Sequence, residues 1–101
     1  MPIIYQFDWD RKKSIANQRK HGVVFRLATS VFRDPLLLTV YDEDHSDLEE
    51  RWATIGKAEN GQYLVVIHTF QHRTTDVTTV RIISARTANR YEIRDYEEGS
   101  H

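Results

Sequence analysis

The sequence predicts an α+β domain with a short N-terminal strand, two helices, an antiparallel sheet of about four strands and a closing helix. Three observations support this prediction: apolar residues follow helical spacing before Asp34-Pro35, they follow extended spacing after it, and the last residues again suit a helix. Because helices beside an antiparallel sheet bury its apolar side chains, we expect the helices to cover one face of the sheet and to leave the other open.

The N-terminal residues predict a strand followed by a helix. Residues 3–9 alternate loosely, as in a short strand. Asp8 or Asp10 can cap a helix that extends to about Lys20, because a carboxylate accepts hydrogen bonds from first-turn amides. Gly22 suits the left-handed residue that ends such a helix. The side chains expected to face inward are Ile15 and Ala16, and those expected to face outward are Lys12, Asn17, Arg19 and Lys20.

A second helix at about residues 26–32 ends at Asp34-Pro35, since the residue before proline avoids helical dihedral angles. An apolar extended run at residues 36–41 and an acidic loop at residues 42–48 follow. A strand at residues 51–58 then leads to the strongest hairpin signal in the chain.

That signal is Asn60-Gly61, a pair that tolerates the positive φ values of a type I′ turn. The return strand, residues 63–70, is apolar on both faces and is therefore expected at the centre of the sheet. A polar turn, a last strand at residues 78–85 and a helix at residues 88–98 complete the fold.

Length and composition limit the classes of protein that remain. A chain of 101 residues fits one domain, which we place at residues 1–98, and Gly99-Ser100-His101 resembles the start of a tag. There is no cysteine, which excludes disulfides and cysteine-based zinc sites. The N-terminus lacks the features of a signal peptide, and no apolar run approaches the roughly 20 residues that span a bilayer. We therefore expect a cytoplasmic protein that does not contact membranes.

Charged residues are arranged in blocks, although the net charge is only −1. Residues 11–33 carry only basic charges, residues 42–50 only acidic ones, and residues 73–94 carry five arginines. The low net charge argues against a protein that coats nucleic acid by bulk attraction. The blocks fit either solvated faces or a basic groove that accepts a short stretch of RNA.

Three side chains on the predicted strands are candidates for a site. Arg81 is a charge on an apolar strand, which is costly unless it is paired or faces an open surface. His68 lies on the central strand, and Arg51 begins the strand before it, so the three could converge near one end of the sheet. Strict alternation places Arg86 on the opposite face from Arg81.

Structural explanations are also open for these residues. Arg51 could form a surface ion pair with Glu49 or Glu50, and His68 could be a hydrogen-bonded core histidine. Lys20-His21 could simply complement a helix dipole.

Arginine and histidine suit RNA cleavage by the ribose 2′-hydroxyl. That reaction needs a general base, a general acid and fixed cations for the charge that grows on phosphorus. Arginine binds phosphate oxygens in two places, and histidine titrates near neutrality. No metal is required, because the nucleophile belongs to the substrate.

A set of short motifs resembles the BrnT family, the toxin half of a type II toxin–antitoxin pair, and the resemblance covers residues 7–98. In order, the motifs are Phe7-Asp8-Trp9-Asp10, Arg19-Lys20-His21-Gly22-Val23, Val31-Phe32-Arg33-Asp34-Pro35, residues 42–51, Ile55-Gly56, Arg81-Ile82-Ile83-Ser84-Ala85-Arg86, and Arg90, Glu92, Tyr96 and Glu97. Their joint order is more specific than any single motif.

The resemblance implies a RelE-like fold and a metal-independent endoribonuclease that needs no cofactor and halts translation. It also implies a BrnA-like ribbon-helix-helix antitoxin, through which alone the toxin would reach operator DNA. An alternative is a catalytically weak subunit of a complex that represses its own operon through that antitoxin.

On the positions that match the family, the resemblance implies a set of site residues. Arg51 and Arg81 would grip the scissile phosphate, and His68 or Glu50 would carry the proton. The residues expected to contact RNA are Lys20, His21, Arg86 and, by stacking a base, Tyr96.

Overall fold

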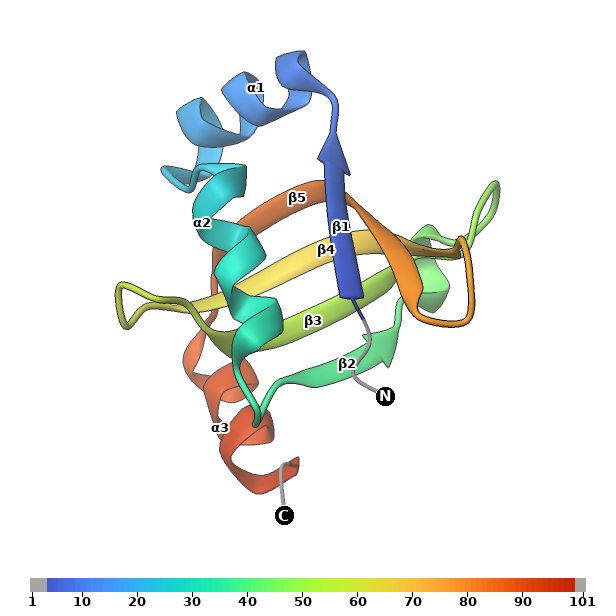
Figure 1. The fold of residues 1–101 in the computed structure, drawn as a ribbon. Helices are drawn as coiled ribbons and strands as arrows, with labels where there is room; N and C mark the ends of the chain where they lie inside the picture. Colours follow the sequence, from blue (N-terminus) through green and yellow to red (C-terminus); the bar gives the residue numbers. More distant parts are fainter. Residues whose placement is uncertain (1–3, 100–101) are drawn as a thin grey trace.

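A computed structural model describes residues 4–99 and shows three α-helices and a five-stranded sheet (Figure 1). The elements are β1 (Ile4–Trp9), α1 (Arg11–His21), α2 (Phe25–Thr29), the 3-10 helix η1 (Ser30–Arg33), β2 (Leu38–Tyr41), the 3-10 helix η2 (Glu43–His45), β3 (Trp52–Lys57), β4 (Tyr63–His72), β5 (Val77–Thr87) and α3 (Arg90–Gly99). The α+β class and the order of elements agree with the prediction. Gly99 of the expected tag ends α3, while Ser100 and His101 lie outside the described residues.

The sheet is mixed, with strand order β1-β5-β4-β3-β2. Strands β2 to β5 pair antiparallel with their neighbours, and β4 lies at the centre, as its apolar residues predict. Strand β1 is different, because it runs parallel to β5 and pairs only with its first half, from Val77 to Ile82. The second half of β5 therefore needs another partner along its edge.

Helix α1 provides that partner through Asn17. The Asn17 amide donates to the carbonyl oxygen of Ala85 (2.9 Å) and accepts from the Ala85 amide (3.1 Å), as a neighbouring strand would. It also donates to the carbonyl oxygen of Val23. Lys12, Arg19 and Lys20 are exposed as predicted, but the predictions for Ile15, Ala16 and Asn17 were wrong, because Asn17 is buried while Ile15 and Ala16 are exposed. A buried amide that satisfies strand edges explains the reversal.

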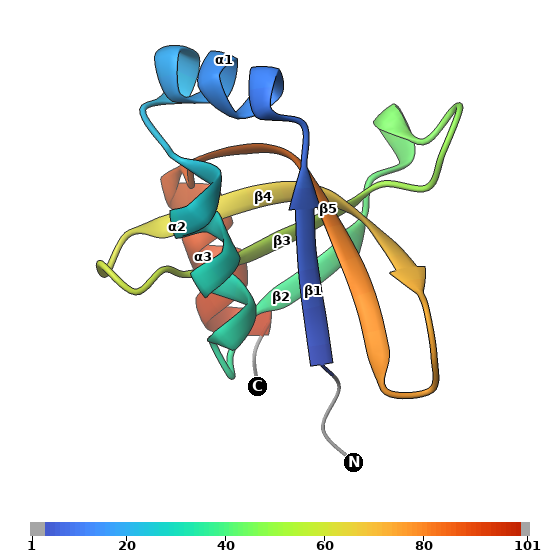
Figure 2. The same cartoon turned by 45° about the horizontal axis from the view of Figure 1, so that its top comes forward.

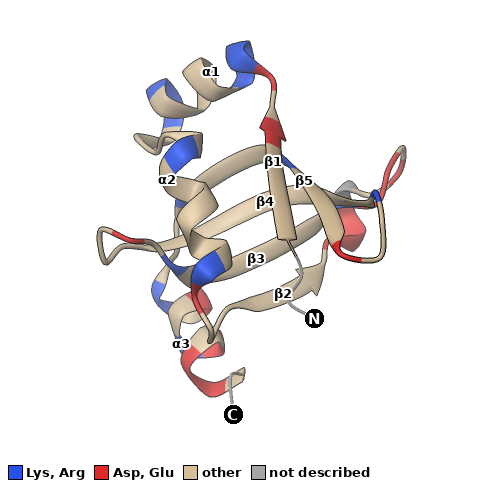
Figure 3. Ribbon diagram, viewed as in Figure 1, with Lys and Arg blue, Asp and Glu red and all other residues tan. Residues whose placement is uncertain are grey.

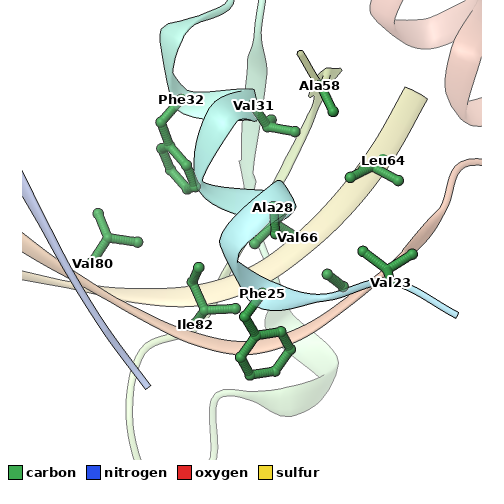
Figure 4. Packing of buried hydrophobic residues seen from close by; sticks show 11 residues of the cluster. Val23, Phe25, Ala28, Val31, Phe32, Ala58, Leu64, Val66, Val80 and Ile82 are labelled. Carbon is green, nitrogen blue, oxygen red and sulfur yellow. The ribbon is translucent and has the colours of Figure 1, made fainter. Parts of the chain in front are cut away.

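The main core lies between α2 and one face of the sheet (Figure 4). The fully buried Phe25, Ala28 and Val31 pack against the side chains that β4 and β5 present to this face. Gly56 on β3 lies under η1, which follows α2 directly, and an added Cβ there would stand 2.7 Å from Val31. This face of the sheet is closed.

Helix α3 packs on the opposite face, as the two views in Figures 1 and 2 show. Its buried Tyr96 belongs to a second, smaller cluster with Ile55 and Val65, whose side chains point away from α2. The prediction that all helices cover one face was wrong, because the second face also carries apolar residues near one end. The remainder of that face is not covered by a helix.

A bulge in β5 changes which of its residues share a face. Ile82 pairs with His68 while Ser84 pairs with Ile67, so Ile83 is an extra residue in the ladder. Beyond the bulge, Arg86 therefore lies on the same face as Arg81, although strict alternation separates them. The predicted split of the two arginines was wrong for this reason.

Local turns confirm most of the predicted signals. Asp10 caps α1 by accepting from the amides of Lys12 and Lys13, and Gly22 ends it at φ 71°. The hairpin at Asn60-Gly61 forms, but only Gly61 has positive φ, so its turn is not of type I′. The turn is longer, and its Asn60 side chain accepts from the amide of Gln62.

Candidate functional site

The open face of the sheet carries the three arginines predicted for the site and two adjoining hollows. Arg81 and Arg86 come from β5, and Arg51 immediately precedes β3. The first hollow, of about 560 Å³, is lined by residues that include Asp8, Glu49, Glu50, Thr69, Arg73 and Arg81. The second hollow, of about 480 Å³, includes Arg51 and Arg86. The fold thus brings all three predicted arginines to one surface.

Glu49 lies between two of these arginines. Its carboxylate oxygens are 2.6 and 2.5 Å from Nη2 of Arg81, and 3.8 Å separates one of them from Nη2 of Arg51. All three side chains are partly exposed. The Nε atom of Arg51 is buried and has no hydrogen-bond partner among the described residues. A single anionic group therefore holds the two guanidinium groups that were predicted to bind phosphate.

Arg86 is held by the start of α3. Its guanidinium donates to both oxygens of Glu92 at 2.8 and 2.7 Å, and Glu92 also accepts from the amide of Asn89. The hydrogen bond from Arg86 lowers the pKa of Glu92, and the same bond raises the pKa of Arg86. Arg86 is therefore fixed at the border between the second hollow and α3.

The predicted residues Lys20 and His21 line a third hollow at the end of α1. This hollow shares Ile83 and Ser84 with the second one, so the two adjoin at the bulge of β5. The charged residues of α1 are all basic, as Figure 3 shows, and no carboxylate on this helix offsets them. The basic charges of α1 thus extend the surface that carries the three arginines.

His68 lies on the other face and is not part of this site. It is fully buried between Phe32 and Phe70, and its Nε2 is 2.6 Å from Oγ1 of Thr54. Burial lowers the pKa of His68 to about 4, although its contact with the carbonyl of Thr69 opposes the shift. The prediction that His68 converges with Arg51 and Arg81 was wrong, and the alternative of a hydrogen-bonded core histidine is confirmed.

Tyr96 is also unavailable to a substrate. Its ring is buried against Tyr63, and its hydroxyl donates to Asp34 at 2.6 Å. Burial, together with the hydrogen bond to Asp34, raises the pKa of Tyr96 to about 12. Partial burial opposes ionisation of Asp34, but hydrogen bonds from Tyr96 and from the amides of Lys57 and Leu36 lower its pKa overall. The predicted base-stacking role does not fit this position.

Sequence reasoning missed two contributors to the first hollow. Glu49 could have been found from its place beside Arg51, where the ion pair was considered only as a structural alternative. Asp8 reaches the hollow because β1 pairs in parallel with β5, which brings it opposite Arg81. Nothing in the sequence alone gives that pairing. Glu50, predicted with His68 as one of two candidate proton carriers, does line the hollow.

A protein-family model, described as the ribonuclease toxin BrnT of type II toxin–antitoxin systems, matches residues 9–92. The chain belongs to the BrnT toxin family. This assignment confirms the resemblance drawn from the sequence motifs. No curated protein matches the chain significantly. Among solved structures, the 1.1 Å crystal structure of the Brucella abortus ribonuclease toxin BrnT matches with 24% identity and a TM-score of 0.48, over 89% of this chain and 99% of that one.

None of the helices in residues 4–99 has both the length and the hydropathy that crossing a bilayer requires.

Proposed function

We propose that this BrnT-family toxin is a metal-independent endoribonuclease that cleaves RNA through the ribose 2′-hydroxyl. The observation that carries the proposal is the placement of Arg51 and Arg81 around the single carboxylate of Glu49. A phosphate diester carries one negative charge and paired oxygens, as a carboxylate does, and arginine binds both kinds of group in the same forked geometry. RNA would take the place of Glu49 between the two guanidinium groups.

In the proposed reaction, the 2′-oxygen attacks phosphorus and the bond from phosphorus to the 5′-oxygen breaks. The products are a 2′,3′-cyclic phosphate and a 5′-hydroxyl end, whose proton is supplied by water in the open hollow. Arg51 and Arg81 stabilise the charge that grows on the phosphoryl oxygens. Glu50 lines the same hollow as Arg81 and is our candidate for the base that takes the 2′-proton.

Basic residues beyond the two central arginines would hold the rest of the strand. Lys20 and His21 line the third hollow, which adjoins the second hollow at the bulge of β5. Arg86 lines the second hollow. We assign these three residues to the RNA backbone. His68 and Tyr96 receive no role in catalysis, because both are buried away from this surface.

Family membership supports the remaining parts of the proposal. A toxin of a type II system has an antitoxin partner, and we propose that this partner is a BrnA-like ribbon-helix-helix protein through which the toxin contacts operator DNA. We further propose that the toxin acts in the cytoplasm, that it inhibits translation by cleaving RNA, and that its fold is RelE-like.

The test compares cleavage of end-labelled RNA, in excess EDTA, by wild type, Arg51→Ala, Arg81→Ala and Arg33→Ala. Arg33 is the matched control, because it is an exposed arginine that pairs with Glu59 and lines neither of the two hollows. We expect losses of at least ~100-fold for Arg51→Ala and Arg81→Ala, as for removal of a donor to a transition-state anion, and no loss for Arg33→Ala. Circular dichroism checks folding. Full cleavage by both folded variants at the site would overturn the proposal.

One observation favours the alternative of a binding subunit. Each of the three arginines faces a carboxylate in the free protein, namely Glu49 or Glu92, which lowers the positive charge of the surface. If wild type leaves RNA intact and does not slow bacterial growth without its antitoxin, the binding role replaces the catalytic one.

A further inference from the structure

The second hollow differs from the first in the chemistry of its floor. Apolar side chains from four strands form this floor, which lies on the face opposite α2 and extends under the edge of α3. They are Val40, Ala53, Ile55, Val65, Ile67 and Ile83. The hollow measures about 480 Å³, within the range of small-molecule sites. An apolar floor of this size contributes little to holding phosphates and suits a flat, weakly hydrated group instead.

Its rim places that group beside the proposed cleavage point. Arg51 lines the second hollow and also lies 3.8 Å from Glu49, which lines the first. A phosphate held by Arg51 and Arg81 would therefore lie next to the second hollow, within reach of the base of an adjoining nucleotide. Arg86 on the far rim can hold the following phosphate. Proteins that recognise single-stranded RNA commonly take up unstacked bases in this way.

The polar groups of the second hollow set which base fits. Glu92 is already bound by Arg86 and the Asn89 amide. Two further carboxylates line the hollow together with Ser84 of β5. Asp42, which follows β2, is half-buried, whereas Asp95, one turn further along α3, is exposed. A carboxylate only accepts hydrogen bonds, so its two oxygens favour a base that offers two donor groups side by side. Guanine does so with N1–H and N2–H, whereas adenine, cytosine and uracil each have only one donor group on this edge, next to an acceptor.

We propose that the second hollow binds a guanine base next to the cleaved phosphate and that Asp95 determines this specificity. The apolar floor contacts the flat face of the base, and the carboxylate accepts from N1 and N2. When another base is bound, an acceptor atom of that base faces an oxygen of the Asp95 carboxylate in a partly desolvated place. The cost of these two unpaired acceptors makes the site selective. This inference rests on the proposed function, because it assumes that RNA crosses the open face.

The test uses short RNAs in which one ribonucleotide is flanked by 2′-O-methyl nucleotides, so that only one phosphate can be cleaved. The bases on the two sides of that phosphate are varied among guanine, hypoxanthine and adenine. Hypoxanthine lacks only the N2 amino group of guanine. Cleavage rates are measured for wild type, Asp95→Asn and Glu98→Gln, a control with the same change of charge on the same helix, outside the hollow.

We expect wild type to prefer guanine over adenine by about tenfold or more at one of the two positions, with hypoxanthine between them. Asp95→Asn should lose this preference while it still cleaves, and Glu98→Gln should keep it. Equal rates for all bases in wild type, or an unchanged preference in Asp95→Asn, would overturn the inference and leave the proposed ribonuclease intact. If wild type cleaves none of these RNAs and no natural RNA either, the proposed function fails and takes the inference with it.

Discussion

The two faces of the sheet are built from the same five strands, yet they treat polar groups in opposite ways. Under α2, polar side chains are buried and neutral, as in the hydrogen bond between Thr54 and His68. On the uncovered face they are charged and partly exposed, as in the ion pair between Glu49 and Arg81. The covering helix makes this difference, since a charge can remain on a strand only where water or a counter-charge reaches it.

The comparison distinguishes interactions that stabilise the fold from ion pairs that a substrate phosphate can replace. Partly exposed ion pairs contribute little to stability, so a phosphate can replace Glu49 at small cost. A buried, neutral hydrogen bond has no such substitute. Changes under α2 should therefore alter stability more than activity, and changes on the uncovered face should do the reverse.

The largest expected effect on stability comes from a proton on the covered face. His68 has a folded-state pKa of about 4, against an ordinary value of 6.5, so the unfolded chain takes up the proton first as the pH falls. The loss of stability begins near pH 6.5, grows towards pH 4 and stops there, at about 3 kcal/mol. Urea unfolding at several pH values measures it. His68→Gln should lack this component, and an identical pH dependence in both proteins would contradict the assignment.

The next effect is at the edge of β5. Asn17→Ala removes the side chain that pairs with both backbone groups of Ala85. Leaving these buried groups unsatisfied should cost about 2 kcal/mol, measured by urea unfolding. Ile15→Ala on the same helix is the control, because Ile15 is exposed, and its effect should stay within about 0.5 kcal/mol. Equal effects of the two changes would mean that α1 does not complete the strand edge.

A smaller loss is expected at the contact between α3 and the covered side of the molecule. Tyr96→Phe keeps the buried ring and removes the hydroxyl that donates to Asp34. The free energy of unfolding should fall by about 1 kcal/mol, with RNA cleavage unchanged, because the hydroxyl does not reach the open face. A drop in cleavage by a protein that stays folded would show that Tyr96 acts on substrate after all.

The smallest change in stability should come from Glu49→Gln, together with a gain in RNA binding. Its ion pairs are partly exposed, so unfolding should shift by less than about 1 kcal/mol. Removing the carboxylate frees Arg51 and Arg81 for phosphate, which should tighten binding of uncleavable 2′-O-methyl RNA, measured by fluorescence anisotropy. Glu59→Gln, which frees the distant Arg33, is the control for net charge. Equal gains in RNA affinity for Glu49→Gln and Glu59→Gln would mean that the change in net charge, and not the release of Arg51 and Arg81, causes the tighter binding.

The sequence predicted most of the fold, because local signals specify it. The Asp10 cap, the Gly22 stop and the apolar run of β4 each act over a few neighbouring residues, and each is found where expected. The parallel pairing of β1 with β5 and the place of α3 depend on contacts between distant segments. Periodicity alone does not contain them.

The site could be predicted only in part for the same reason. Arg81 was recognisable, since a charge within an apolar strand requires an uncovered face. The sequence could not show that His68 lies on the opposite face from Arg81. Alternation indicates which residues of one strand share a face, but not which face a helix covers. Arg86 joined Arg81 only through the bulge at Ile83, which no sequence pattern announced.

The pairing of β1 with β5 also sets when the protein can become active. Strand β5 is synthesised after the other four strands, and within residues 4–99 it supplies Arg81, Arg86 and the sheet partner of β1. A nascent chain that has not yet released β5 from the ribosome lacks both the partner of its first strand and two of its three arginines. On the proposed function, the chain therefore cannot attack RNA before β5 has left the ribosome and paired with β1.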